Sequence, residues 1–165
     1  AESNLEVMVK IIDGFFKEKV HKNLWGYCNN VSYRIGEKDN LDTPPTGATF
    51  EINKSNTLFN FLDQSLKDKF NELKDLDCFR CYINCFSSNE NPYFHYDNDK
   101  GYTCLFYPNL EFELEEGGET QFLIDDKIEG ILPIPNRMVL FDANLHHKAT
   151  SYRTKHRFTI AIKYQ

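Results

Sequence analysis

The sequence lacks several features that would assign the chain to a class at once. No apolar run approaches the roughly 18–20 residues that span a bilayer. The N-terminus has no charged region followed by an apolar one, as a secretion signal would have. Basic residues do not dominate, because 19 Lys and Arg face 25 Asp and Glu and give a net charge of −6. We therefore expect a cytoplasmic protein that binds neither membrane nor nucleic acid.

The cysteines do not form the pattern of a disulfide-linked domain. There are five of them at irregular spacing, which is typical of reduced thiols in a cytosol. Cys78, Cys81 and Cys85 resemble a metal-binding spacing, but Cys81 and Cys85 share one face of an alternating run with Phe79 and Ile83. We favour buried strand thiols, and a zinc or redox site stays open as the alternative.

Aromatic residues are abundant. The 165 residues include 14 Phe and 9 Tyr, a content that favours a folded, β-rich protein over a disordered one. The length suffices for one domain with a sizeable core. We predict a single domain, 1–165, in which residues 1–76 give helical and strand support and residues 77–165 form a β core.

Two stretches repeat apolar side chains at helical spacing. The first covers about residues 3–19 and the second about 56–74, where Ser55 or Asn56 can be the N-cap. Between them, Trp25 to Arg34 is rich in β-forming residues and favours a strand.

Residues 35–50 are expected to form a loop, because Pro44, Pro45 and Gly47 exclude regular structure. A loop of this length in a small domain is often a lid or a binding loop. A flexible surface loop without a function explains these residues equally well.

After about residue 77 the apolar period changes to two. This period predicts strands at 79–86, around His95, and at 102–107, 120–124, 128–132, 138–142 and 157–164. Short strands at such spacing indicate an antiparallel sandwich or barrel. The apolar faces of the two helices then need this sheet to cover.

His95 and Asp97 lie two residues apart, which is the repeat of one face of a strand, so both side chains can reach one cavity. An imidazole and a carboxylate are two members of the 2-His-1-carboxylate triad that holds non-haem iron with open positions. The pair alone is weak evidence, because a polar surface turn, "HYDNDKG", explains it as well.

Three further histidines follow this pair: His146, His147 and His156. An apolar strand, 138–141, delivers the first two to the end of a sheet, whereas His156 is expected to be solvated at a strand end. Ten residues after His147, Arg157 opens the last strand. A guanidinium that returns to the same cavity can bind a carboxylate with two hydrogen bonds.

The order His95-x-Asp97, His147, Arg157 resembles the signature of the Fe(II)/2-oxoglutarate-dependent dioxygenases. Two segments resemble prolyl hydroxylases in particular, "TCLFYPN" (103–109) and "EEGGETQFL" (115–123), and "RFTIAIKY" (157–164) resembles the closing strand of the family. The similarity covers about residues 80–164, roughly half of the chain. One departure puts the subfamily in doubt, because collagen-type prolyl 4-hydroxylases usually carry Lys where this chain has Arg157.

The resemblance implies a β-dominated α+β fold, a double-stranded β-helix (a cupin-like jelly-roll) with two N-terminal supporting helices. It implies that His95, Asp97 and His147 hold Fe(II) and are the catalytic residues, and that Arg157 binds the distal carboxylate of 2-oxoglutarate. O₂ would complete the reactants, and a requirement for ascorbate stays open. The segment "HKATS" and the gap to Arg157 favour His147 over His146 as the ligand.

Four more residues are carried over as contacts of the keto acid. Tyr107 matches a tyrosine that donates its hydroxyl to the distal carboxylate, and Thr120 lies where the family lines the keto-acid pocket. Thr103 shares the face of Tyr107. Asn84 matches an Asn-x-Tyr pattern in which Phe86 here replaces the tyrosine. Simple core packing remains the alternative for these positions.

The resemblance also suggests the substrate. The leading hypothesis is hydroxylation of a prolyl residue in a protein or peptide, over which the loop 35–50 and the aromatic segment around Trp25 could close. A free amino acid or another small molecule is the alternative substrate. A jelly-roll that binds a metal or ligand without catalysis is the alternative of another class, disfavoured because the chain keeps the triad and Arg157. The oligomeric state is not predicted.

Overall fold

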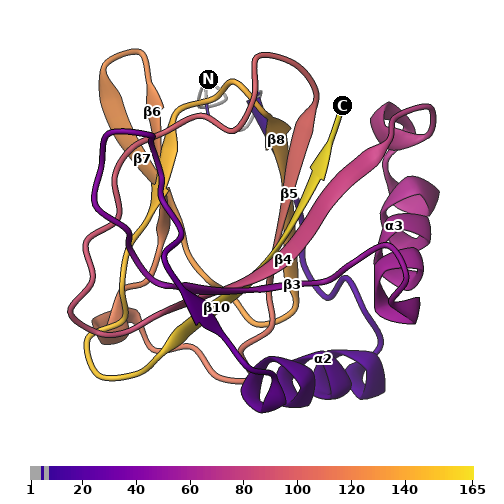
Figure 1. The fold of residues 1–165 in the computed structure, drawn as a ribbon, viewed down its shortest axis with the longest axis horizontal. Coiled ribbons are helices and arrows are strands. Elements are labelled where there is room, and N and C mark those ends of the chain that lie inside the picture. The colour runs from indigo at the N-terminus through magenta and orange to yellow at the C-terminus, as the bar shows by residue number, and fades with distance from the viewer. Residues whose placement is uncertain (1–4, 6–7) are drawn as a thin grey trace.

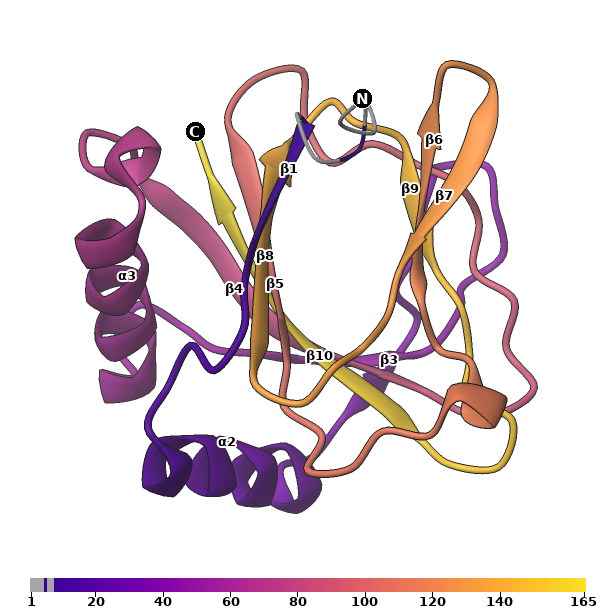
Figure 2. The ribbon, with the colours of Figure 1, turned by 180° about the vertical axis from the view of Figure 1, so that it is seen from behind.

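Two antiparallel sheets dominate the fold, which a computed structural model describes for residues 5 and 8–165 (Figure 1). The larger sheet has seven strands in the order β1-β8-β5-β10-β4-β3-β2, and the smaller has three in the order β7-β6-β9. Seen from behind, the smaller sheet stands opposite β8 and β5 (Figure 2). The predicted jelly-roll of two antiparallel sheets with supporting helices is confirmed.

The larger sheet comprises β1 (Val9–Ile12), β2 (Arg34–Ile35), β3 (Ala48–Glu51), β4 (Cys78–Phe86), β5 (Tyr102–Tyr107), β8 (Arg137–Asp142) and β10 (Arg157–Tyr164). The smaller sheet comprises β6 (Thr120–Ile124), β7 (Lys127–Ile131) and β9 (His147–Ala149). The helices are α2 (Glu18–Asn30) and α3 (Thr57–Lys69), and the 3-10 turns are η1 (Asn71–Leu73) and η2 (Leu114–Glu116). None of the described helices is both long and apolar enough to cross a membrane.

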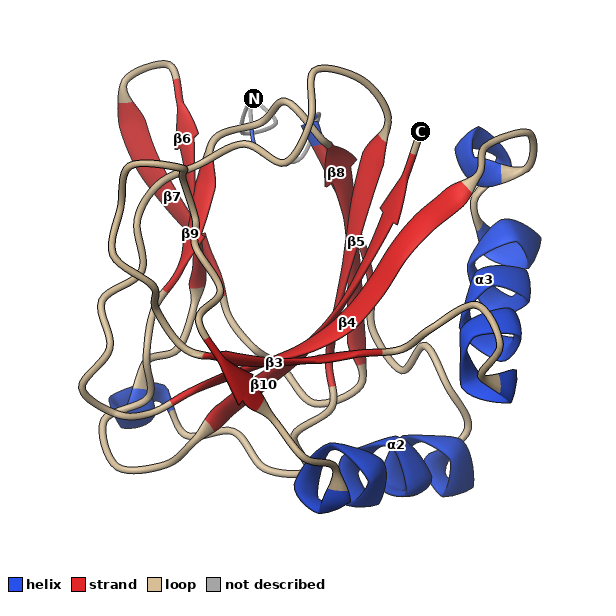
Figure 3. Cartoon of the chain, in the orientation of Figure 1, coloured by secondary structure: helices blue, strands red, loops and turns tan. Residues whose placement is uncertain are grey.

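The two helices cover the outer face of the larger sheet (Figure 3). Alternate residues of a strand point to opposite faces, so each central strand contributes one row of side chains to this layer. The buried cluster joins Leu24 and Cys28 of α2, Leu62 and Leu66 of α3, Ile83 of β4, Phe106 of β5 and Ile160 of β10. A second cluster lies between the sheets and joins Leu105, Tyr107, Phe122, Val139 and Phe141.

The prediction of a helix over 3–19 is wrong from residue 9 to residue 17. Residues 9–12 form β1, which pairs antiparallel with β8. Leu5 and Met8 are helical, and residues 1–4 and 6–7 lie outside the described part. The β-branched residues in this run favour a strand, and the apolar positions serve two layers, with Val9 between the sheets and Phe16 in the outer cluster.

The strand favoured over Trp25 to Arg34 is also wrong, because α2 extends to Asn30. The buried residues of α2 are His21, Leu24 and Cys28, a helical spacing. Burial of this stripe against the sheet outweighs the strand preference of single aromatic residues.

The second helix and the strands from β4 onward agree with the sequence, except that β9 was not predicted and the strand predicted around His95 is absent from the described chain. The Asn56 side chain caps α3 by accepting a hydrogen bond from Leu58 N at 2.9 Å. No strand forms around His95 within the described chain. This segment is irregular, and an isolated β-bridge joins His95 to His147.

All five cysteines are free. Cys78 and Cys81 are buried and Cys85 is half-buried. Burial raises the pKa of the Cys78 thiol to about 12, so it stays protonated at neutral pH and is a poor metal ligand. Among the described residues, the cysteines form no metal-binding group.

A tight turn before β5 depends on glycine. Gly101 has a φ of 95°, and a Cβ at this position would overlap the backbone carbonyl of Tyr164. Gly101→Ala is therefore expected to lower the free energy of unfolding by about 2–3 kcal/mol. Urea denaturation measures the change.

Gly26→Ala is the matched control, because a Cβ on Gly26 in the middle of α2 would meet nothing within 4 Å. It is expected to raise the free energy of unfolding by about 0.5–1 kcal/mol. Equal effects of the two substitutions would contradict this description of the turn.

Candidate metal centre

Three side chains that the sequence singled out come together between the sheets. His95 and Asp97 lie on the irregular segment after β4, and His147 opens β9. The backbones of His95 and His147 exchange two hydrogen bonds, at 3.0 and 2.9 Å, which hold the two residues side by side. One potential ligand atom from each of the three residues lies within 4.8 Å of the others.

Each imidazole is oriented by a backbone carbonyl. His95 Nδ1 lies 3.0 Å from Tyr93 O, and His147 Nδ1 lies 2.8 Å from Leu145 O. A carbonyl only accepts, so Nδ1 carries the proton and Nε2 of the neutral ring keeps its lone pair. Both Nε2 atoms lie 3.6 Å from an oxygen of Asp97. Metal-binding histidines are typically oriented in this way.

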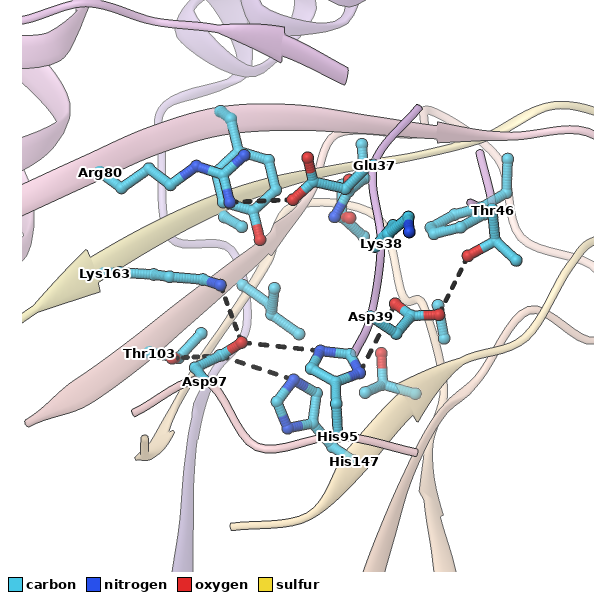
Figure 4. A pocket seen from close by; sticks show the side chains of 18 of the residues that line it. Glu37, Lys38, Asp39, Thr46, Arg80, His95, Asp97, Thr103, His147 and Lys163 are labelled. Atoms are coloured by element: carbon cyan, nitrogen blue, oxygen red, sulfur yellow. Dashed lines mark hydrogen bonds and ion pairs between the residues drawn. The ribbon is translucent and has the colours of Figure 1, made fainter. Parts of the chain in front are cut away.

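The Asp97 carboxylate lies between these rings and two donors, as Figure 4 shows. Thr103 Oγ1 donates to Oδ2 at 2.5 Å, and Lys163 Nζ donates to Oδ1 at 2.8 Å. Burial alone would raise the pKa of Asp97, but Lys163, His147 and the two hydrogen bonds lower it to about 2. The carboxylate is therefore ionised, as a metal ligand must be.

Burial also decides the charge of His147. Burial lowers the pKa of this imidazole to about 4, although Asp97 opposes the change. His147 is therefore neutral at pH 7, which is the form that binds a metal.

These ligands border a cavity of about 210 Å³. One wall is formed by three adjacent strands, β5, β10 and β4. In each of them every second side chain points into the cavity, because successive residues of a strand face opposite sides of the sheet. These inward-facing rows comprise Tyr82 and Asn84 of β4, Thr103 and Leu105 of β5, and Arg157, Thr159, Ala161 and Lys163 of β10.

Arg157 lies at the opposite end of its row from Lys163 and is only 1% exposed. Its Nε donates to Gly118 O at 2.8 Å and its Nη2 donates to Thr120 Oγ1 at 2.9 Å, which uses two of the five N–H donors of a guanidinium. The described ion pairs of arginine are those of Arg80 and Arg137. Arg157 is thus a buried cation without a carboxylate partner among the described residues.

The four residues carried over as keto-acid contacts occupy different positions. Thr103, Thr120 and Asn84 line the cavity, whereas Tyr107 does not. The hydroxyl of Tyr107 lies 2.6 Å from Thr120 Oγ1, and its ring centroid lies 5.7 Å from Arg157 Cζ. Tyr107 therefore lies behind two residues that line the cavity. Thr103 is already bonded to Asp97. Contacts of these four residues with a keto acid stay predictions.

The remaining histidines lie away from the ligand set. His146 is exposed, with its ring 5.3 Å from that of Tyr96, and His156 is exposed too. Trp25 does not line the cavity, because α2 places it edge-to-face against Phe158. It is therefore not positioned to close over a substrate there.

Two charged residues next to the candidate ligands, Lys163 and Asp39, were missed from the sequence. Lys163 could have been predicted from the sequence. It is an even number of residues from Arg157 on the same strand, so the two side chains point to the same face. No sequence pattern predicts the position of Asp39, because the long loop before β3 brings it beside the ligands. Its Oδ2 accepts a hydrogen bond from Tyr93 N at 2.8 Å, and its Oδ1 lies 3.6 Å from His95 Nδ1.

No protein-family model and no curated protein matches the sequence. Solved structures do match. One is an oxidoreductase of the 2OG-Fe(II) oxygenase family from Burkholderia pseudomallei (TM-score 0.77, 14% identity, 97% of this chain and 86% of that chain). Another is a Trichoplax adhaerens prolyl hydroxylase in complex with a hypoxia inducible factor peptide fragment (TM-score 0.72, 17% identity, 97% and 84%).

A third neighbour is HygX from Streptomyces hygroscopicus, solved with nickel, 2-oxoglutarate and hygromycin B (TM-score 0.73, 11% identity, 97% and 84%). At these identities the likeness is one of fold. The chain has the fold of the 2OG-Fe(II) oxygenases.

The pKa of His147 predicts how the stability of the metal-free protein depends on pH. The unfolded imidazole gains its proton near pH 6.5, but the buried one does so only near pH 4. The unfolded state therefore binds more protons between these values, and stability falls as pH falls through this window, by roughly 3 kcal/mol. Urea unfolding with a chelator, from pH 7 to pH 4, measures the slope.

His147→Gln should flatten this slope, because the residue no longer titrates. Asp97, with its lowered pKa, contributes only below pH 3.8 and does not obscure the comparison. A slope that survives the substitution would show that another group is responsible.

Proposed function

We propose that this protein is an Fe(II)- and 2-oxoglutarate-dependent dioxygenase that hydroxylates an unactivated C–H bond, with a prolyl residue of a protein or peptide as substrate. The observation that carries this proposal is the shared cavity. A candidate metal-ligand set borders it, and so does Arg157, a cation without a carboxylate partner among the described residues. When bound, Fe(II) with 2-oxoglutarate and O₂ supplies the oxidising chemistry, and the keto acid leaves as succinate and CO₂.

The donor set fits the metal. Two imidazoles, His95 and His147, and one ionised carboxylate, Asp97, make up the 2-His-1-carboxylate set of non-haem iron oxygenases. The Nε2 atoms are already oriented by their carbonyl partners. The chain therefore presents three ligands and leaves the cavity side free for a keto acid and O₂.

Arg157 suits the distal carboxylate of the keto acid. Its free N–H groups offer charge-assisted hydrogen bonds, and the Thr120 hydroxyl lies beside them. Thr120, which Arg157 contacts, is two residues from Phe122, which pairs with His147, so the backbones of Thr120 and Phe122 are about 7 Å apart along β6. A five-carbon dicarboxylate can bridge such a gap, with one end at the metal and the other at Arg157.

The prolyl substrate rests on weaker support. The segments "TCLFYPN" and "GGET" resemble prolyl hydroxylases, and one neighbour was solved with a peptide. Tyr96 lines the cavity and is 49% exposed, so its ring is available to pack against a proline. A small polar molecule is the second candidate, because Glu37, Lys38 and Arg80 also line the cavity.

Turnover tests the proposal directly. Iron-loaded protein with 2-oxoglutarate and O₂ is expected to form succinate, and to add one oxygen atom to a proline-containing peptide or to a free amino acid in a mass-spectrometric screen. Protein that neither binds 2-oxoglutarate nor forms succinate would rule out the proposal. Succinate formation with oxygen added only to the amino acids would favour the small-molecule candidate.

Arg157→Gln is expected to weaken 2-oxoglutarate binding about 10- to 100-fold, because it removes one or two charge-assisted hydrogen bonds. Metal affinity should stay close to that of the wild type. Calorimetric titration of Mn(II)-loaded protein in oxygen-free buffer measures both. Arg34→Gln removes an exposed arginine on β2 and is the matched control. Unchanged 2-oxoglutarate affinity in Arg157→Gln would refute the role given to this residue.

A further inference from the structure

Lys163 is another largely enclosed cation of the cavity, and it differs from Arg157 in having a carboxylate partner among the described residues. Its Nζ lies 2.8 Å from Asp97 Oδ1, and its side chain is only 12% exposed. The register of β10 places it opposite Thr103 of β5 on one side and Arg80 of β4 on the other. Its position is therefore fixed by the centre of the sheet.

Two strands together hold the Asp97 carboxylate in one orientation. Lys163 of β10 donates to Oδ1, and Thr103 of β5 donates to Oδ2 (Figure 4). Each carboxylate oxygen has two acceptor directions, so each keeps one for a further partner. His95 Nε2 lies 3.6 Å from Oδ1 and His147 Nε2 lies 3.6 Å from Oδ2. The free acceptor directions are thus the ones available to a metal between these rings.

Charge gives Lys163 a second effect. A buried carboxylate is costly unless a cation pairs with it, and in the metal-free chain Lys163 is the cation in direct contact with Asp97. A divalent metal bound to the same carboxylate would place two more positive charges beside the ammonium. Like charges in a buried site repel strongly, so the group that stabilises the empty site also opposes the incoming metal.

We infer that Lys163 is a positioning residue. In the metal-free protein its positive charge neutralises the Asp97 carboxylate and keeps it buried and oriented. The same charge repels an incoming metal ion and so lowers the affinity of the site for the metal. The inference rests on the metal centre of the proposed function. It goes further, because an ordinary orienting residue would strengthen metal binding and Lys163 weakens it. Removing the charge of Lys163 distinguishes the two roles, because it would weaken metal binding if Lys163 only oriented Asp97 and strengthens metal binding if Lys163 repels the metal.

Lys163→Met keeps an unbranched side chain, one heavy atom shorter, and removes its charge. Mn(II) alone is the probe, without 2-oxoglutarate or O₂, and calorimetry and thermal unfolding are the measurements. The metal-free variant is expected to unfold at a lower temperature than the wild type, to bind Mn(II) about 10-fold more tightly, and to gain more thermal stability from it. Lys163→Arg keeps the charge and is expected to restore wild-type metal affinity.

Lys100→Met is the matched control, since Lys100 is exposed and three residues from Asp97. It makes the same change in net charge and should leave Mn(II) affinity unchanged. Equal or weaker Mn(II) binding by Lys163→Met, when the wild type binds Mn(II) and 2-oxoglutarate normally, overturns the inference and leaves the proposed function intact. A wild type that does not bind Mn(II) overturns both.

If Lys163→Met does not fold without metal, added Mn(II) is expected to restore the fold, because the metal then supplies the missing charge. Circular dichroism with and without Mn(II) follows this recovery. Continued failure to fold with Mn(II) counts against the inference.

Discussion

The buried carboxylate of Asp97 is the constraint on which the rest of the site depends. A charge that is 2% exposed must be compensated from every side, and the fold does so with groups from both sheets. β5 and β10 supply a hydroxyl and an ammonium, and β9 supplies an imidazole. The irregular segment that carries Asp97 is in turn fixed by its bridge to β9. A candidate metal site follows, because the same carboxylate faces an Nε2 atom of each imidazole at 3.6 Å.

Because side chains alternate along each strand, one face of the larger sheet packs the apolar core and the other face lines the cavity. In β10, Ile160 and Ile162 face the helices, whereas Arg157, Thr159, Ala161 and Lys163 face the cavity. β4 alternates in the same way, with Ile83 outward and Tyr82 and Asn84 inward. The two helices therefore cover only the outer face, and the inner face is free to hold charged groups. The two ends of the β10 row have different partners, since Lys163 pairs with Asp97, whereas Arg157 donates to Gly118 O and Thr120 Oγ1.

The sequence predicts the second half of the chain better than the first, for a physical reason. From β4 onward, alternation and turn residues agree with the fold except around His95 and at β9, and the three candidate ligands are recognisable from their order with Arg157. In the first half, the local secondary-structure preferences of the residues gave wrong predictions. The apolar spacing around Val9 suggested a helix, and the aromatic residues near Trp25 suggested a strand. Pairing with β8 decides the first segment and burial against the sheet decides the second. Asp39 could not be predicted, because a loop brings it to residues 54 positions away.

The central claim is that one cavity holds a metal on His95, Asp97 and His147 and a keto acid between that metal and Arg157. A crystal structure of the protein with Mn(II) and 2-oxoglutarate, prepared without oxygen, tests it most directly. The account predicts Mn(II) about 2.0–2.3 Å from both Nε2 atoms and one Asp97 oxygen, with the distal carboxylate of the keto acid on Arg157. A metal held by other residues, or a keto acid bound away from Arg157, would contradict it.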